Sequence, residues 1–110
     1  MTELASYQER DGVALVTMDD GKANALSHGM LEALMGAFDR AESGAKALLL
    51  HGRAGRFCAG FDLRTMMSGV EQAKALVTEG ADVLLRLYGL PMPVVAACSA
   101  GRFRCMKKPM

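Results

Sequence analysis

Short continuous apolar runs alternate with stretches of helical spacing along this chain. Residues 13–18 form a β-branched apolar run that is typical of a strand, and residues 7–10 can pair with it through a turn at Asp11 and Gly12. Two further apolar runs, at residues 47–51 and 94–98, predict buried strands. The three runs are separated by segments long enough to carry a helix each.

Two of these segments carry amphipathic patterns. The first begins after Ser27, the expected N-cap, ends near Gly44, and has on its apolar face Leu26, Met30, Leu31, Leu34 and Phe38. The second runs from about residue 70 to residue 87 and is predicted to present on one face Val70, Ala73, Leu76, Val77, Leu84 and Leu87. A short helix should start near Phe61 and Asp62. Continuous apolar strands alternating with helices predict an α/β layered domain with right-handed parallel crossovers.

Composition narrows the class of protein. The chain has 110 residues, 51% of them hydrophobic and 23% charged, which suits one small globular domain and excludes a fully disordered chain. The longest uncharged apolar run, residues 90–100, is about half of the roughly 20 residues that a membrane-spanning helix needs. The first twelve residues carry acids and no apolar signal region, so we expect a cytoplasmic protein.

Cysteine and charge patterns exclude further classes. The three cysteines, Cys58, Cys98 and Cys105, include no CxxC pair, so a zinc ribbon or a disulfide scaffold is disfavoured and buried reduced thiols are expected. Residues 102–110 hold four basic side chains and no acid, whereas residues 1–101 hold nine basic and twelve acidic ones. Four charges with one aromatic are a weak signal for nucleic acid, and we expect neither a nucleic-acid partner nor a membrane span.

A glycine-rich stretch, residues 52–60, is the most informative for chemistry. It follows a predicted buried strand and opens a helix. Glycine lets the backbone approach a ligand closely, and peptide N–H groups at such a turn can stabilise a phosphate or an oxyanion. The same pattern also suits an ordinary strand-to-helix turn, and it matches neither a P-loop nor a dinucleotide fingerprint.

Three segments carry recognisable motifs. Residues 21–27 read Gly-Lys-Ala-Asn-Ala-Leu-Ser, residues 57–63 read Phe-Cys-Ala-Gly-Phe-Asp-Leu, and residues 90–98 read Leu-Pro-Met-Pro-Val-Val-Ala-Ala-Cys. In this order they resemble the Lys-x-Asn-Ala-Leu turn, the Phe-x-Ala-Gly-x-Asp-Leu loop and the Pro-Val-Ile-Ala-Ala strand of the enoyl-CoA hydratase/isomerase (crotonase) superfamily. The resemblance covers roughly residues 5–101, the N-terminal part of a family member.

The resemblance implies a crotonase-like (ClpP/crotonase) α/β fold, a spiral of ββα units, here truncated. It implies hydration or isomerisation of 2-enoyl-CoA thioesters, with the thioester oxyanion held by two backbone N–H groups, the first of them on Phe61. The coenzyme A cleft would then be lined by Lys22, Ala23, Ala59, Gly60, Asp62, Leu63 and Arg64. Coenzyme A would enter as part of the acyl-CoA substrate, with no tightly bound cofactor and no metal. Full-length family members form homotrimers or hexamers.

Other ionisable residues receive no catalytic role. Asp62 lies in the first turn of a predicted helix, where its carboxylate offsets the helix dipole. His28 and His51 have no partner evident from the sequence. Arg53 and Arg56 either add positive potential near the cleft or are solvated surface charges. Two helical glutamates are expected to face solvent, Glu71 and Glu79.

The resemblance ends after the third strand. The family continues with a Gly-x-Ala-x-Gly-Gly segment, which supplies the second oxyanion N–H, and later with acid–base glutamates, whereas here residues 102–110 form a basic tail outside the pattern. We therefore divide the chain into residues 1–101, the N-terminal part of an acyl-CoA-binding domain, and residues 102–110. The composition shift suggests a changed reading frame or a truncated gene. We expect exposed apolar surface, a bare sheet edge and poor solubility.

Two functions follow from these observations. One is a truncated enoyl-CoA hydratase or isomerase, in which the loss of one oxyanion donor typically costs about 10²–10³ in rate. The alternative is a non-catalytic fragment that binds coenzyme A or acyl-CoA. Binding without turnover would discriminate the second from the first.

Overall fold

A twisted four-stranded sheet forms one layer of the molecule. The computed structural model describes residues 4–53 and 55–98. Strands β1 (Ala5–Arg10) and β2 (Val13–Met18) pair antiparallel, and the two-residue turn between them has positive φ at both Asp11 and Gly12, 55° and 85°. Two left-handed residues match the right-handed twist of a hairpin, which explains the Asp-Gly sequence there. The predicted hairpin is confirmed, with β1 starting two residues earlier than expected.

The remaining strands of this sheet are parallel. β4 (Ala47–His51) lies beside β2, and β6 (Val94–Ala97) lies beside β4, so that the order is β1-β2-β4-β6. Alternate side chains of β2 and β4 are buried on one face, and their neighbours are half-buried except for the exposed Val13. Both strands have the bounds that the apolar runs predict, whereas β6 ends one residue before Cys98.

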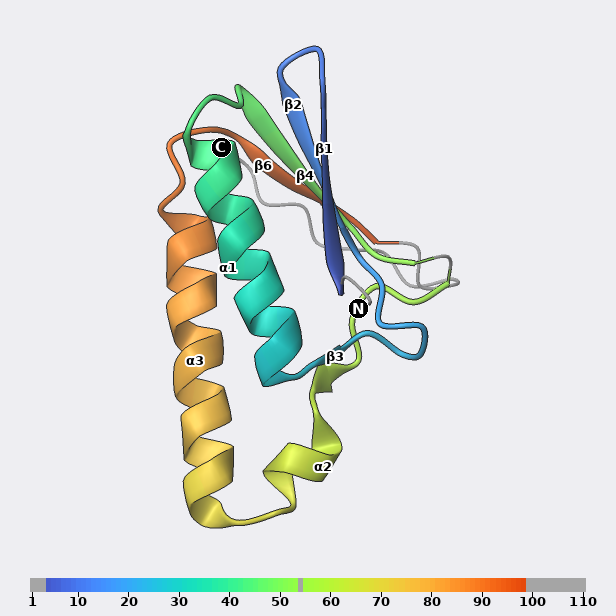
Figure 1. The fold of residues 1–110 in the computed structure, drawn as a ribbon, viewed down its shortest axis with the longest axis vertical. Helices are drawn as coiled ribbons and strands as arrows, with labels where there is room; N and C mark the ends of the chain where they lie inside the picture. Colours follow the sequence, from blue (N-terminus) through green and yellow to red (C-terminus); the bar gives the residue numbers. More distant parts are fainter. Residues whose placement is uncertain (1–3, 54, 99–110) are drawn as a thin grey trace.

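Two long helices cover one face of the sheet. Helix α1 (His28–Glu42) and helix α3 (Val70–Tyr88) lie side by side, as Figure 1 shows. The Ser27 side chain accepts a hydrogen bond from the Met30 N–H at 3.2 Å, so the predicted N-cap is confirmed. The core between the layers is mainly aliphatic, and Phe38 is the one fully buried aromatic ring among the described residues.

The predicted apolar face of α3 is partly wrong. The helix buries Leu76, Gly80 and Val83, whereas Val70 is 70% exposed and Leu84 is 60% exposed. Val70, Val77 and Leu84 are seven residues apart. Seven residues are not a whole number of 3.6-residue turns, so these side chains shift gradually around the helix and lie beside its buried face. Apolar residues occur on both sides of α3, so their spacing alone did not identify the side that contacts α1.

A second, two-stranded sheet was not predicted. Strand β3 (Ala25–Leu26) pairs parallel with β5 (Gly60–Phe61), and helix α2 (Leu63–Met66) follows directly. Figure 1 shows this sheet and α2 near the end of the helices where α1 and α3 begin. The predicted short helix is thus confirmed, and it starts one to two residues later than expected. No helix within the described ranges is long and apolar enough to cross a membrane.

Candidate active site at the β3–β5 junction

Two loops that are far apart in the sequence meet at the β3–β5 pair. Ala25 pairs with Gly60 and Leu26 with Phe61. The Ala59 N–H donates to the Asn24 carbonyl at 3.0 Å, and the Asp62 N–H donates to the Leu26 carbonyl at 2.9 Å. The structure therefore brings together the two motif segments, 21–27 and 57–63, that the sequence singled out.

Gly60 reverses the direction of the peptide N–H groups in this strand. The N–H groups of Ala59 and Asp62 both face β3, although residues an odd number apart in a regular strand point to opposite sides. The reversal coincides with Gly60, whose φ of +91° is accessible to glycine at little cost. Because Phe61 is extended and precedes Asp62, its own N–H points away from β3.

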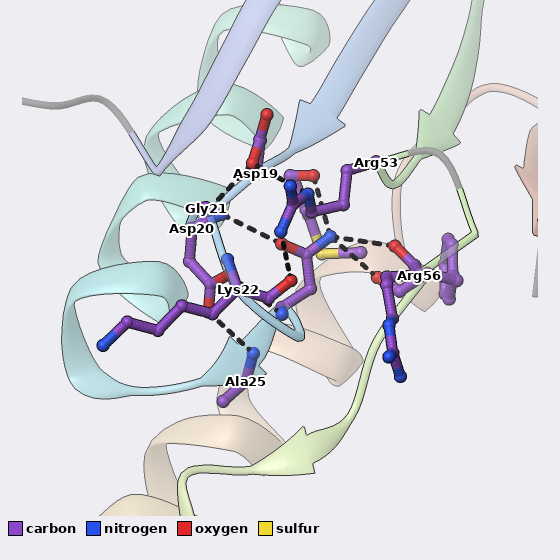
Figure 2. Close-up of polar contacts among 10 residues, drawn as sticks. Asp19, Asp20, Gly21, Lys22, Ala25, Arg53 and Arg56 are labelled. Carbon is purple, nitrogen blue, oxygen red and sulfur yellow. Dashed lines mark hydrogen bonds and ion pairs between the residues drawn. The ribbon is translucent and has the colours of Figure 1, made fainter.

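The loop from β2 to β3 is organised by the Asp20 carboxylate. It accepts hydrogen bonds from the backbone N–H groups of Lys22 (2.7 Å), Asn24 (2.9 Å) and Ala25 (3.0 Å), as drawn in Figure 2. Partial burial alone would raise the pKa of the Asp20 carboxyl. The three N–H donors and the nearby Arg53 charge outweigh burial and hold this pKa below its usual value.

Asn24 joins this loop to the other one. Its side chain is fully buried, and its Nδ2 donates to the carbonyls of Met18 (2.9 Å), Arg56 (3.1 Å) and Phe57 (3.1 Å). Its Oδ1 accepts the Asp20 N–H at 2.9 Å. Asn24 itself has φ of +63°, a conformation that asparagine tolerates better than most residues. Both loops are therefore held by one amide.

The two arginines of the glycine-rich loop differ. Arg53 forms an ion pair with Asp19, Nε to Oδ1 3.4 Å, and donates from its guanidinium to the Lys22 carbonyl. Arg56 is exposed, and Figure 2 shows its side chain extending away from the hydrogen-bonded cluster. Arg53 therefore fixes the β2–β3 loop, a role that the sequence did not indicate.

Asp62 is the N-cap of α2. Its carboxylate accepts from the Thr65 hydroxyl at 2.7 Å and from the Thr65 N–H at 3.1 Å, and these bonds lower the pKa of Asp62. The positive charges of Arg64 and Lys22 contribute to the same pKa decrease, so both cations act on this junction. Asp62 thus lies one residue before the helix, and not in its first turn as expected, and its structural role is that of a side-chain cap.

The other predicted cleft residues surround this junction with different exposure. Lys22, Ala59 and Arg64 are exposed, Ala23 is half-buried, and Leu63 is 72% exposed. Figure 2 shows the Lys22 side chain extending away from the cluster that holds its backbone. The Phe61 ring instead packs inward against α3, next to Gly80.

An apolar groove lies between α2 and α3. It has a volume of about 670 Å³ and is lined by Met66, Met67, Val70 and Val77 among others. Sequence patterns placed Val70 and Val77 in the core, so this groove was not expected.

The remaining candidate groups lie elsewhere. The Nδ1 atom of His28, at the start of α1, hydrogen-bonds with the Glu79 carboxylate of α3, so Glu79 is not the purely solvent-facing residue that was expected. Cys58 is a free but exposed thiol, contrary to the expectation of a buried reduced thiol, Cys98 is half-buried, and Cys105 lies outside the described residues. Within the part of the chain that the structure describes, no cluster of His, Cys, Asp or Glu could hold a metal ion.

Comparison with known proteins identifies the family. The family described as enoyl-CoA hydratase/isomerase matches residues 8–101. The chain belongs to the enoyl-CoA hydratase/isomerase family. A probable enoyl-CoA hydratase from Bacillus subtilis is 34% identical over 89 residues, which cover 77% of this chain and 34% of that protein. A second probable enoyl-CoA hydratase, from Rhodobacter capsulatus, is 34% identical over 93 residues, 83% of this chain and 36% of that protein.

Solved structures show that the fold is crotonase-like. An enoyl-CoA hydratase/isomerase family protein from Pseudomonas syringae superimposes with a TM-score of 0.83 at 36% identity, covering 87% of this chain and 42% of that one. An enoyl-CoA isomerase from Mtb gives a TM-score of 0.82 at 38% identity, covering 89% and 43%. The expected fold class is confirmed. The chain spans about a third of the length of its curated relatives.

Two residues of this family member's junction were missed by sequence reasoning. The sequence indicated only a polar turn at Asp20, and Asn24 stood out only as one position of the Lys-x-Asn-Ala-Leu motif. Asx residues before a short apolar pair commonly bond to nearby backbone groups, which was the available signal for Asp20. The three acceptors of Asn24 include two carbonyls 32 and 33 positions away, which no local pattern encodes.

Proposed function

We propose that this chain binds enoyl-CoA thioesters and supplies one hydrogen-bond donor, the Phe61 N–H, to the thioester oxyanion. The single observation that carries the proposal is the reversal at Gly60. It leaves the Asp62 N–H on Leu26 and turns the Phe61 N–H to the opposite side, where a ligand carbonyl can accept it. A fixed N–H aimed at developing negative charge lowers the barrier to enolate formation.

Charge at the junction supports the binding of coenzyme A. Lys22 lies in the loop before β3 and Arg64 in the helix after β5, so these two exposed cations both border the β3–β5 junction. We assign the coenzyme A phosphates to these two cations. Ala23, Ala59, Gly60, Asp62 and Leu63 would form the adjoining cleft.

The family reaction is hydration or isomerisation of 2-enoyl-CoA, in fatty acid metabolism, and we place it in the cytoplasm. A second oxyanion donor and a pair of acid–base carboxylates are needed to complete it. With one donor alone the rate should fall by about 10²–10³, and without the carboxylates the proton transfers are lost as well. For the residues described here we therefore propose binding of the acyl-CoA thioester, and turnover is measured beside it.

Titration of the purified chain with crotonyl-CoA and with free coenzyme A tests the proposal. Saturable binding of both, with no loss of the enoyl absorbance over time, supports a binding function. Steady loss of that absorbance would instead support a working hydratase. If neither ligand binds, the proposal is refuted.

A further inference from the structure

Asn24 is the one fully buried polar side chain in the described part of the molecule, and its amide is fully used. Its Nδ2 bonds to the end of β2 through Met18 and to the second loop through Arg56 and Phe57. Its Oδ1 accepts from Asp20. A buried amide with all partners satisfied is costly to disturb, because each abandoned partner loses its hydrogen bond in a low-dielectric site.

The main chain of Asn24 extends the same connection. Its carbonyl accepts the Ala59 N–H at 3.0 Å, so one residue binds backbone atoms of residues 56, 57 and 59. These positions lie just before Gly60 and Phe61. The position of the Phe61 N–H therefore depends on a segment that Asn24 holds from one side.

The backbone of Gly52 also packs closely against this segment. A Cβ atom at Gly52 would lie 2.7 Å from the Arg56 carbonyl oxygen and 2.8 Å from that of Phe57, the same two carbonyls that Asn24 binds. Residues 56 and 57 are therefore held by close packing on Gly52 and by hydrogen bonds from the Asn24 amide. Loss of the amide removes the hydrogen bonds and leaves only the packing contact.

We propose that Asn24 is a positioning residue for the thioester carbonyl: without touching the ligand, it fixes where the Phe61 N–H lies. The inference rests on the proposed function of Phe61. Small displacements matter here, since a misplacement of about 1 Å can cost roughly 10²-fold in rate. Asn24 should thus affect polarisation of the bound carbonyl much more than affinity for the coenzyme A part.

The test measures carbonyl polarisation and coenzyme A affinity separately, in the full chain. Cinnamoyl-CoA is a chromophoric enoyl thioester whose absorption moves to longer wavelength when its carbonyl accepts a hydrogen bond, and free coenzyme A reports binding alone. Asn24→Gly keeps access to positive φ and removes the amide, whereas Asn24→Asp keeps the shape and removes the donor. Gln8→Ala, on the exposed strand β1, is the matched control for loss of an amide.

Both Asn24 variants should lose the red shift of bound cinnamoyl-CoA while the dissociation constant of coenzyme A changes by less than about threefold, under 1 kcal/mol. Gln8→Ala should keep both the red shift and the coenzyme A affinity of the wild type. In Asn24→Asp the shift should return as the pH falls, because a protonated carboxyl can donate to one of the carbonyls again.

Three results would overturn the positioning role. The first is a wild-type red shift in either Asn24 variant. The second is equal loss of coenzyme A affinity and of red shift, which would mark a general structural role. If the Asn24 variants do not fold, Asp20→Asn decides, because it weakens the support of the Asn24 N–H from a partly exposed site. It should reduce the red shift at constant coenzyme A affinity, and an unchanged shift is the third contrary result.

The wild-type chain distinguishes this proposal from the one on which it rests. A wild-type chain that binds neither probe refutes the proposed function and the positioning role together. A wild-type chain that shifts the probe, with variants that shift it equally, refutes the positioning role alone.

Discussion

The Phe61 ring occupies the space that a side chain at Gly80 would fill. A Cβ atom built on Gly80 would lie 2.5 Å from Phe61 Cε1 and 2.8 Å from Cζ. Strand β5 therefore packs against α3 only because residue 80 is glycine. Phe61, whose N–H we assign to the oxyanion, is thus held on two sides. The N–H of its neighbour Asp62 bonds to β3, and the Phe61 ring packs against α3.

Gly80→Ala should push the Phe61 ring away from α3. We expect the free energy of unfolding to fall by about 1–2 kcal/mol, since overpacking costs about 1–3 kcal/mol and the gain in helix propensity offsets up to about 1. Urea denaturation measures this change. Gly36→Ala in α1 is the control: its Cβ would meet nothing within 4 Å, so it should stabilise the chain by up to about 1 kcal/mol. Equal stabilisation by both variants would contradict the packing relationship.

Gly52→Ala should be more damaging than Gly80→Ala. Its Cβ would lie 2.6 Å from Phe57 Cα, and backbone atoms cannot yield as a ring can. We expect a loss of about 3 kcal/mol or more in the same denaturation experiment. Gly44→Ala, which has open space around its Cβ, is the matched control. A midpoint for Gly52→Ala close to that of the wild type would show that the two loops are not confined as described.

Stability should depend on the ionisation of Asp20. Its folded pKa lies below the value of about 3.9 for an unfolded aspartate. The stabilisation is therefore fully present above about pH 4 and is lost as the pH falls through the folded pKa. Denaturation midpoints between pH 7 and pH 3 should fall less steeply for Asp20→Asn than for the wild type. Asp82→Asn, on an exposed part of α3, removes the same charge without touching the turn and serves as the control.

Removal of Lys22 or Arg64 should weaken the binding of free coenzyme A. Exposed charge pairs contribute about 0.2–1 kcal/mol, so each alanine variant should raise the dissociation constant by about 1.4- to 5-fold. The effect should shrink as salt concentration increases. Lys46→Ala, an exposed lysine just before β4, is the control and should leave the binding isotherm unchanged. Identical isotherms for all three variants would remove these cations from the proposed phosphate site.

The exposed face of α3 should promote self-association. Val70, Leu84, Leu85 and Tyr88 are each 60% exposed or more and lie on one helix, which is unusual for an isolated soluble chain. We expect concentration-dependent oligomers by light scattering after size-exclusion chromatography. Leu84→Lys combined with Leu85→Lys should increase the monomer fraction. A wild-type chain that stays monomeric and unfolds cooperatively on heating would contradict this prediction.

Much of the main sheet and of α1 could be predicted from the sequence. The strands at residues 13–18 and 47–51, the hairpin turn at Asp11 and the cap at Ser27 all depend on residues close to one another in the chain. Burial periodicity, turn chemistry and capping are local effects, so the sequence expresses them directly. The motif resemblance identified the family, and the comparisons with known proteins confirmed it.

Contacts between distant segments were decided only by the tertiary structure. Which face of α3 is buried depends on α1 and on the Phe61 ring, and apolar residues on both sides of the helix made its pattern ambiguous. The two-residue strands β3 and β5 are too short to carry a pattern of their own. Their pairing exists because the Asn24 amide, buried among carbonyls from two loops, stabilises an arrangement that neither loop specifies alone.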